Sequence, residues 1–163
     1  MAKTELTRDD LMAPEAYAAE RRAHAQRISA VKADRRVAVG PDATFYFESW
    51  DTMWFQVHEM LHIEKGGEEQ IADELAAYNP LIPNGRELTA TMMIEIPDPG
   101  RRHKVLAGLG GIEETVVMIV NGEEIRGKAE EDVDRTNAAG KASSVQFIHF
   151  PFTDAQVAAF RAD

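Results

Sequence analysis

The dipeptide Asn121-Gly122 most constrains the fold of this chain, because it stands between two β-rich runs, residues 115–120 and 123–127. Asn-Gly is the preferred two-residue turn of a β-hairpin, since both of its positions adopt positive φ angles. A second hairpin is indicated around residues 40–43, where Gly and Pro interrupt β-branched and aromatic residues. Hairpins join neighbouring antiparallel strands, so the sequence favours an antiparallel sheet over a parallel, doubly wound one.

Helical patterns precede and separate these strands. Ser49 is a typical N-cap, and Pro14 stands at the first position of a long helical segment. Helices are expected at residues 14–34, 49–65, 68–78, 101–109 and 153–163, further strands at 88–96 and 143–150, and a surface loop at 128–142. We therefore expect a single α+β domain over residues 1–163. In it an antiparallel sheet of about five or six strands packs against the long N-terminal helix and shorter helices.

Composition excludes several classes of function. The chain has 163 residues and no cysteine, which rules out disulfides, thiolate metal sites, iron–sulfur clusters and a cysteine nucleophile. Its 18 basic and 28 acidic residues give a net charge of −10, which argues against nucleic acid or an anionic membrane as a partner. No apolar stretch reaches the roughly 18 residues of a membrane span, and the N-terminus does not resemble a secretory signal. We expect a cytoplasmic location.

The motif His58-Glu59-Met60-Leu61-His62 is the sharpest local signal for chemistry. Residues four apart lie on one face of a helix, so His58 and His62 can bind one zinc ion while Glu59 activates a water molecule as the catalytic base. The third ligand is open: metzincins would place Gly and His where this chain has Lys65 and Glu68.

The same histidines allow other metal sites. His24 on the preceding helix can complete a mononuclear zinc or iron site with His58 and His62. Acidic residues of the following helix are further candidates for a third ligand, namely Glu69, Asp73 and Glu74. A ferritin-like di-iron site is excluded, because it needs a second E-x-x-H element in a four-helix bundle. The simpler interpretation is that these histidines lie half exposed on the flank of the helix, without a metal. The stripe of Trp50, Trp54, Val57 and Leu61 then forms its buried face.

Several stretches together carry a family resemblance: residues 6–11, 35–44, 56–64, 77–83, 91–95 and 141–147. The chain resembles a bacterial domain-of-unknown-function family, often encoded beside a rubrerythrin-like protein and an iron–sulfur oxidoreductase. The resemblance implies an accessory role in redox chemistry or peroxide defence. Five positions match the pattern of this family and are the candidate site residues: Gln56, Glu59, Glu64, Tyr78 and Asn79. The resemblance implies that most family members carry Arg where this chain has His62, so the complete H-E-x-x-H motif would be a substitution in this chain.

Helical geometry places Gln56, Glu59 and Glu64 on more than one stripe of the helix. We expect Glu64 to be drawn toward the protein, where a buried carboxylate needs a donor. Arginines on neighbouring elements can supply it, namely Arg35, Arg36 and Arg86. The group is interpreted either as a structural ion pair or as a polar binding pocket beside Tyr78 and Asn79.

The leading interpretation is an accessory protein that acts by protein–protein contact, with a rubrerythrin-like or other redox protein as partner and self-association as a further option. The alternative is a metal-binding enzyme, hydrolytic or oxygen-handling, centred on His58, Glu59 and His62. Whether the chain is an enzyme stays open on the sequence alone. The identity of a cofactor also stays open, and zinc and iron are the candidates.

Overall fold

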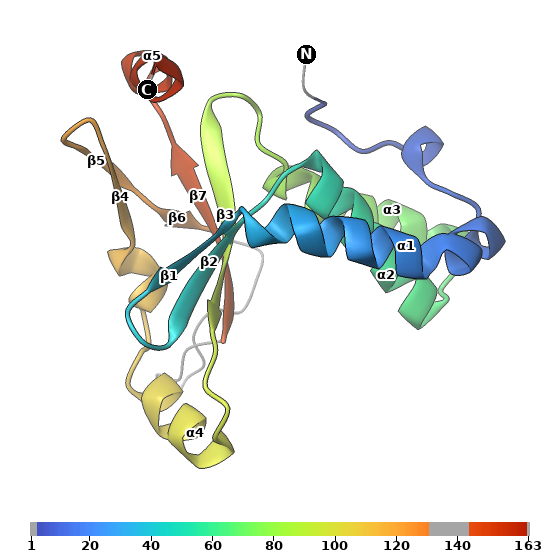
Figure 1. Ribbon diagram of the computed structural model, residues 1–163, viewed down its shortest axis with the longest axis horizontal. Helices are drawn as coiled ribbons and strands as arrows, with labels where there is room; N and C mark the ends of the chain where they lie inside the picture. The colour runs from blue at the N-terminus through green and yellow to red at the C-terminus, as the bar shows by residue number, and fades with distance from the viewer. Residues whose placement is uncertain (1–2, 131–143, 163) are drawn as a thin grey trace. The chain divides into compact units, whose positions relative to one another are not determined.

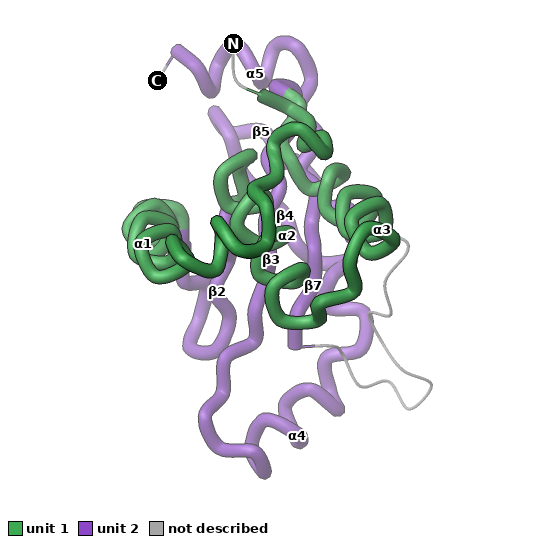
Figure 2. Tube along the Cα trace, turned by 90° about the vertical axis from the view of Figure 1, so that its right-hand side faces the viewer, with its two compact units in different colours: residues 1–35, 48–84 green, residues 36–47, 85–163 purple. Residues whose placement is uncertain are grey.

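The computed structural model describes residues 3–130 and 144–162 and divides the chain into two compact units (Figure 2). Unit 1 comprises Met1–Arg35 and Glu48–Asn84, and unit 2 comprises Arg36–Phe47 and Gly85–Asp163. The expected loop at 128–142 falls largely outside the described residues. The expected ends of two elements, Ser143 and Asp163, also lie outside them. The single domain expected for residues 1–163 stays a prediction.

Unit 1 is helical. Its elements are η1 (Arg8–Asp10), α1 (Pro14–Ala33), α2 (Trp50–Glu64), α3 (Glu68–Tyr78) and η2 (Asn79–Leu81). Helix α1 begins at a proline, whose missing N–H would have no partner at that position. Helix α2 begins after Ser49, whose Oγ accepts a hydrogen bond from the N–H of Thr52 at 3.3 Å. No helix among the described residues is long and apolar enough to cross a bilayer.

Helices α1 and α2 pack on each other and form the core of unit 1. Tyr17 and Ile28 are the buried residues of α1, and the buried face of α2 includes Trp54 and Val57. Trp50, the expected second anchor of this stripe, is only half buried. The buried side chains recur at helical spacing, so each helix stabilises the other by removing apolar surface from water.

Unit 2 contains the sheets (Figure 1). Its elements are β1 (Arg36–Val39), β2 (Ala43–Phe47), β3 (Glu87–Ile94), α4 (Pro99–Ala107), η3 (Ile112–Thr115), β4 (Val117–Val120), β5 (Glu123–Arg126), β6 (Lys128–Ala129), β7 (Val145–Pro151) and α5 (Asp154–Ala162). Five strands form one sheet in the order β1-β2-β3-β7-β6, with every pair antiparallel. The α+β class and the antiparallel sheet are therefore confirmed. The packing of α1 on this sheet stays a prediction.

Strands β4 and β5 form a separate two-stranded sheet around Asn121 and Gly122. These two residues have φ angles of 51° and 80°, as the Asn-Gly turn requires. Ile125 of β5 is buried in the main core of unit 2 together with Met92 and Ile148 of the large sheet. The hairpin thus covers the apolar face of the five-stranded sheet with its own inward-facing residues.

Candidate functional site

The H-E-x-x-H motif lies on α2, and its first histidine is buried, with 2% of its surface exposed. Nδ1 of His58 donates a hydrogen bond to the carbonyl oxygen of Trp54 at 2.8 Å, and Nε2 accepts one from the N–H of Met12 at 3.0 Å. A carbonyl can only accept and an amide N–H can only donate, so the ring is neutral with its proton on Nδ1. Burial lowers the pKa of His58. The expectation of a half-exposed His58 is wrong, because the segment before α1 and Tyr17 of α1 cover it.

Glu59 is bound on both carboxylate oxygens by residues of α1. The Tyr17 hydroxyl donates to Oε2 at 2.5 Å, and Arg21 donates from Nε and Nη2 at 3.0 and 2.9 Å. The hydrogen bonds from Arg21 hold the pKa of the Glu59 carboxyl below its usual range, against the opposing effect of burial. Burial and the bond to Glu59 raise the pKa of Tyr17. This is the geometry of a structural ion pair that joins α1 to α2.

The three predicted histidine ligands surround the ring of Tyr17. Its centroid lies 4.8 Å from that of His58, 5.8 Å from that of His24 and 6.0 Å from that of His62. Trp54 packs against two of these rings, 4.0 Å from His58 and 4.9 Å from His24. We call these five residues the aromatic–histidine cluster. No three His, Asp or Glu side chains of the described part of the chain are placed to hold a metal ion. The zinc or iron site stays a prediction.

The four predicted binding residues separate into three environments. Nε2 of Gln56 donates to the Tyr78 hydroxyl at 3.3 Å, so these two residues do meet. The Asn79 side chain faces the N-terminal segment instead. Glu64 is exposed and accepts a hydrogen bond from Nε2 of Gln70 at 2.9 Å, so the expectation that it is buried against an arginine is wrong. Its position in the last turn of α2 leaves it in water, where no buried donor is needed.

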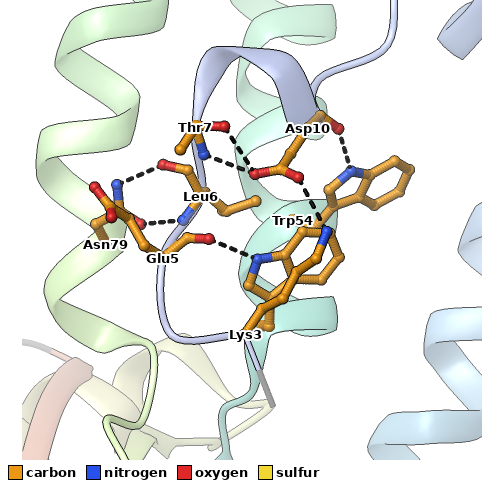
Figure 3. Close-up of polar contacts among 8 residues, drawn as sticks. Lys3, Glu5, Leu6, Thr7, Asp10, Trp54 and Asn79 are labelled. Atoms are coloured by element: carbon orange, nitrogen blue, oxygen red, sulfur yellow. Dashed lines mark hydrogen bonds and ion pairs between the residues drawn. The ribbon is translucent and has the colours of Figure 1, made fainter. Parts of the chain in front are cut away.

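The N-terminal strap, residues 3–12, is held by side chains that bind its backbone (Figure 3). The indole N–H groups of Trp50 and Trp54 each donate to a strap carbonyl at 2.9 Å. The Asn79 amide binds both backbone groups of Leu6: Oδ1 accepts from its N–H at 2.7 Å and Nδ2 donates to its carbonyl at 2.9 Å. Leu6 itself is 1% exposed. Asn79, Trp50 and Trp54 are therefore residues that fix the strap, a role that sequence reasoning missed.

A second ionic cluster, half buried, lies in unit 2. Nδ1 of His149 on β7 faces Oε2 of Glu87 on β3 at 3.2 Å, and Nε2 faces Oε2 of Glu130 at 2.7 Å. Both nitrogens must donate to these carboxylates, which favours the charged imidazolium. The hydrogen bond to Glu87, with the contribution of Glu130 and against the effect of burial, raises the pKa of His149 to about 9.

Unit 2 also carries an open groove of mixed polar and apolar lining, which we call the hairpin groove, between the tip of the β4–β5 hairpin and α5. It has a volume of about 730 Å³ and is lined by Ile119, Val120, Asn121, Ala159, Phe160 and Ala162. Ile119 is 69% exposed and Phe160 is 48% exposed, so two large apolar side chains meet water beside the same groove. The sequence did hold a signal: residues 117–120 are all apolar, although a hairpin with one buried face needs apolar residues only at alternate positions.

The fold and these clusters define a class of α+β protein with a helical unit and an antiparallel sheet unit. A model of the family described as "Protein of unknown function (DUF3501)" matches residues 5–163, so the chain belongs to this family. The chain is also similar to a protein of unknown function from Burkholderia pseudomallei with a known crystal structure. The two are 42% identical, with a TM-score of 0.88 and coverage of 96% of this chain and 82% of that one. No curated protein matches the chain. Membership of a family of unknown function is thus confirmed. The gene neighbourhood implied by the resemblance stays a prediction.

Proposed function

We propose that this chain is a cytoplasmic accessory protein that acts by binding another protein through the hairpin groove. The family resemblance supports a redox protein, such as a rubrerythrin-like protein, as the partner. No chemistry of its own is required of the chain in this role. Its contribution would be to position or stabilise the partner.

The observation that carries this proposal is the exposure of Ile119 and Phe160 on either side of one groove. Contiguous exposed apolar surface on a folded protein marks sites of interaction with other molecules. Fully burying a side chain of this size is worth about 1.5–3 kcal/mol, so a partner that covers both residues gains a useful part of its binding free energy.

The alternative, a metal-binding enzyme centred on His58, Glu59 and His62, has weaker support. Both nitrogens of His58 and both carboxylate oxygens of Glu59 already have partners within unit 1. A metal ion or a catalytic water would have to displace Met12, Tyr17 or Arg21. The groups that a hydrolytic mechanism needs are therefore engaged in holding the helices and the strap together.

The test is a binding measurement between the purified chain and the rubrerythrin-like protein of the same organism. We expect Ile119→Asp and Phe160→Asp each to weaken binding at least about tenfold, or 1.4 kcal/mol. Ile63→Asp is the matched control, because Ile63 is 62% exposed on α2 in unit 1 and lies outside the groove. Equal affinities for wild type, both groove variants and the control would contradict the groove as the binding surface. No binding by wild type would contradict the proposed partner.

A further inference from the structure

Strand β1 is an unprotected edge of the five-stranded sheet. Among the described residues it pairs only with β2, so the backbone groups along its other side have no strand partner. All four of its residues are exposed. Natural edge strands are protected from further pairing by charges, proline or a bulge. Three of the four residues of β1, Val37-Ala38-Val39, carry no charge and no proline.

Two apolar rows of the sheet run outward to this edge and are exposed at their ends. Val37 is opposite Phe45, which is opposite Met92 on the next strand. Phe45 and Met92 are buried, at 8% and 1% exposed, whereas Val37 is 50% exposed. Val39 ends the neighbouring row and is 54% exposed. The core face of the sheet thus ends in two valines that meet water.

We propose that a second copy of this chain covers this edge, with the two β1 strands antiparallel and Ala38 of one copy opposite Ala38 of the other. Residues directly opposite in an antiparallel pair point to the same face. A two-fold axis perpendicular to the sheet keeps the core faces of both copies on one side. A register is therefore allowed only if each core-facing residue of one copy lies opposite a core-facing residue of the other. Among the allowed registers, the one centred on Ala38 places Val37 of each copy opposite Val39 of the other.

The charges at the two ends of β1 fit this antiparallel arrangement. Arg36 is the only charged residue of the strand and lies at its first position. In the proposed register it lies opposite Gly40 of the second copy, beside the turn that carries Asp42. Two acidic residues meet at this turn, since the N–H of Glu95 donates to the Asp42 carbonyl. Arg101 binds the Asp42 carboxylate. The two copies of Arg36 stay about 13 Å apart along the strand direction, so they do not oppose each other.

Because each copy contributes a strand of only four residues, the interface is small and the dimer is expected to be weak and concentration-dependent. Disulfide cross-linking can detect such a weak dimer, because the covalent bond retains the associated copies. The chain has no cysteine, so a single introduced cysteine is its only thiol. Opposite residues of an antiparallel pair have Cα separations of about 4.5–5.5 Å, which lies within the range of a disulfide.

The experiment oxidises single-cysteine variants of the full chain and measures the disulfide-linked dimer on non-reducing gels. We expect Ala38→Cys to cross-link at least about tenfold faster than Arg36→Cys, because only residue 38 meets itself across the axis. Arg36→Cys is the matched control, since it is exposed and on the same strand. A mixture of Val37→Cys and Val39→Cys chains should form the mixed dimer faster than either forms its own. Equal rates for Ala38→Cys and Arg36→Cys would overturn the proposed register.

Sedimentation of the unmodified chain tests the association itself. We expect the dimer fraction of the wild-type chain to rise between about 10 μM and 1 mM. The dimer should be lost in Val37→Lys, in Val39→Lys and in the variant that carries both substitutions. These substitutions lie on an exposed edge, so circular dichroism should show the same fold as wild type. A monomer over the whole concentration range, or a dimer that persists in the double variant, would overturn the proposal.

Discussion

Arg21 of α1 holds the carboxylate of Glu59 of α2 with two parallel hydrogen bonds, of 3.0 and 2.9 Å. Tyr17, one turn before Arg21 on α1, adds a third bond to the same carboxylate at 2.5 Å. The glutamate of the His58–His62 motif is thus the acceptor in an ion pair that joins α1 to α2. Its partners lie 38 and 42 positions away in the sequence.

Replacing Glu59 with Gln should destabilise unit 1. The amide group cannot accept both bonds from Arg21 and one from the buried Tyr17 hydroxyl, so at least one donor loses its partner. We expect the free energy of unfolding to fall by about 1–3 kcal/mol in urea titrations. Glu15→Gln, an exposed change on α1, is the control and should be neutral. A loss in Glu59→Gln no larger than in this control would mean that the ion pair does not stabilise the fold.

The His149 cluster predicts a loss of stability at alkaline pH. Glu87 and Glu130 raise the pKa of His149 to about 9, above its ordinary value of 6.5. The folded state therefore binds the proton more tightly than the unfolded state. Its contribution is fully present below pH 6.5 and is lost as the pH rises through about 9. Urea titrations between these limits should show this decline in wild type and a flatter profile in His149→Gln. An NMR titration that gives His149 an ordinary pKa would contradict the arrangement.

Asn79 predicts local stability in the N-terminal strap. Asn79→Ala removes both hydrogen bonds to the backbone of Leu6, and their net worth is about 0.5–1.5 kcal/mol each. We expect faster hydrogen–deuterium exchange in residues 3–12 and little change in the sheet of unit 2. Glu69→Ala, an exposed change on α3, is the comparison. Unchanged exchange of the strap in Asn79→Ala would show that Leu6 is held by its apolar contacts alone.

His58 gives a direct test of the metal-binding alternative. Because both ring nitrogens are engaged, we expect added zinc to leave the thermal midpoint of the wild-type chain unchanged. His58→Ala should lose about 2–5 kcal/mol, since it leaves a cavity and two backbone groups without their partner. His58→Gln keeps one donor and one acceptor and should lose less. Near-stoichiometric zinc or iron in protein purified without an affinity tag, and absent from His58→Gln, would instead favour the metal-binding enzyme.

Sequence reasoning recovered the local elements because their signals are local. Ser49 caps α2 with its own hydroxyl, and the Asn121-Gly122 turn adopts the positive φ angles that its residues favour. The short strand β6 was not expected, since two residues carry no readable alternation. The separation of β4 and β5 into their own sheet was not expected either, because strand order depends on contacts between distant segments.

The candidate site shows the same difference between local signals and contacts made by distant segments. By itself the sequence determined that His58 and His62 share one helix and that Glu59 lies between them, because helical periodicity is a property of neighbouring residues. Only the tertiary structure decided that His58 is buried beneath the strap, that Glu59 binds Arg21 and that Glu64 stays in water. Burial and hydrogen-bond partners come from whichever segments pack against the helix. A periodic pattern states which face is apolar, but it does not state which segment covers that face or which donors that segment brings.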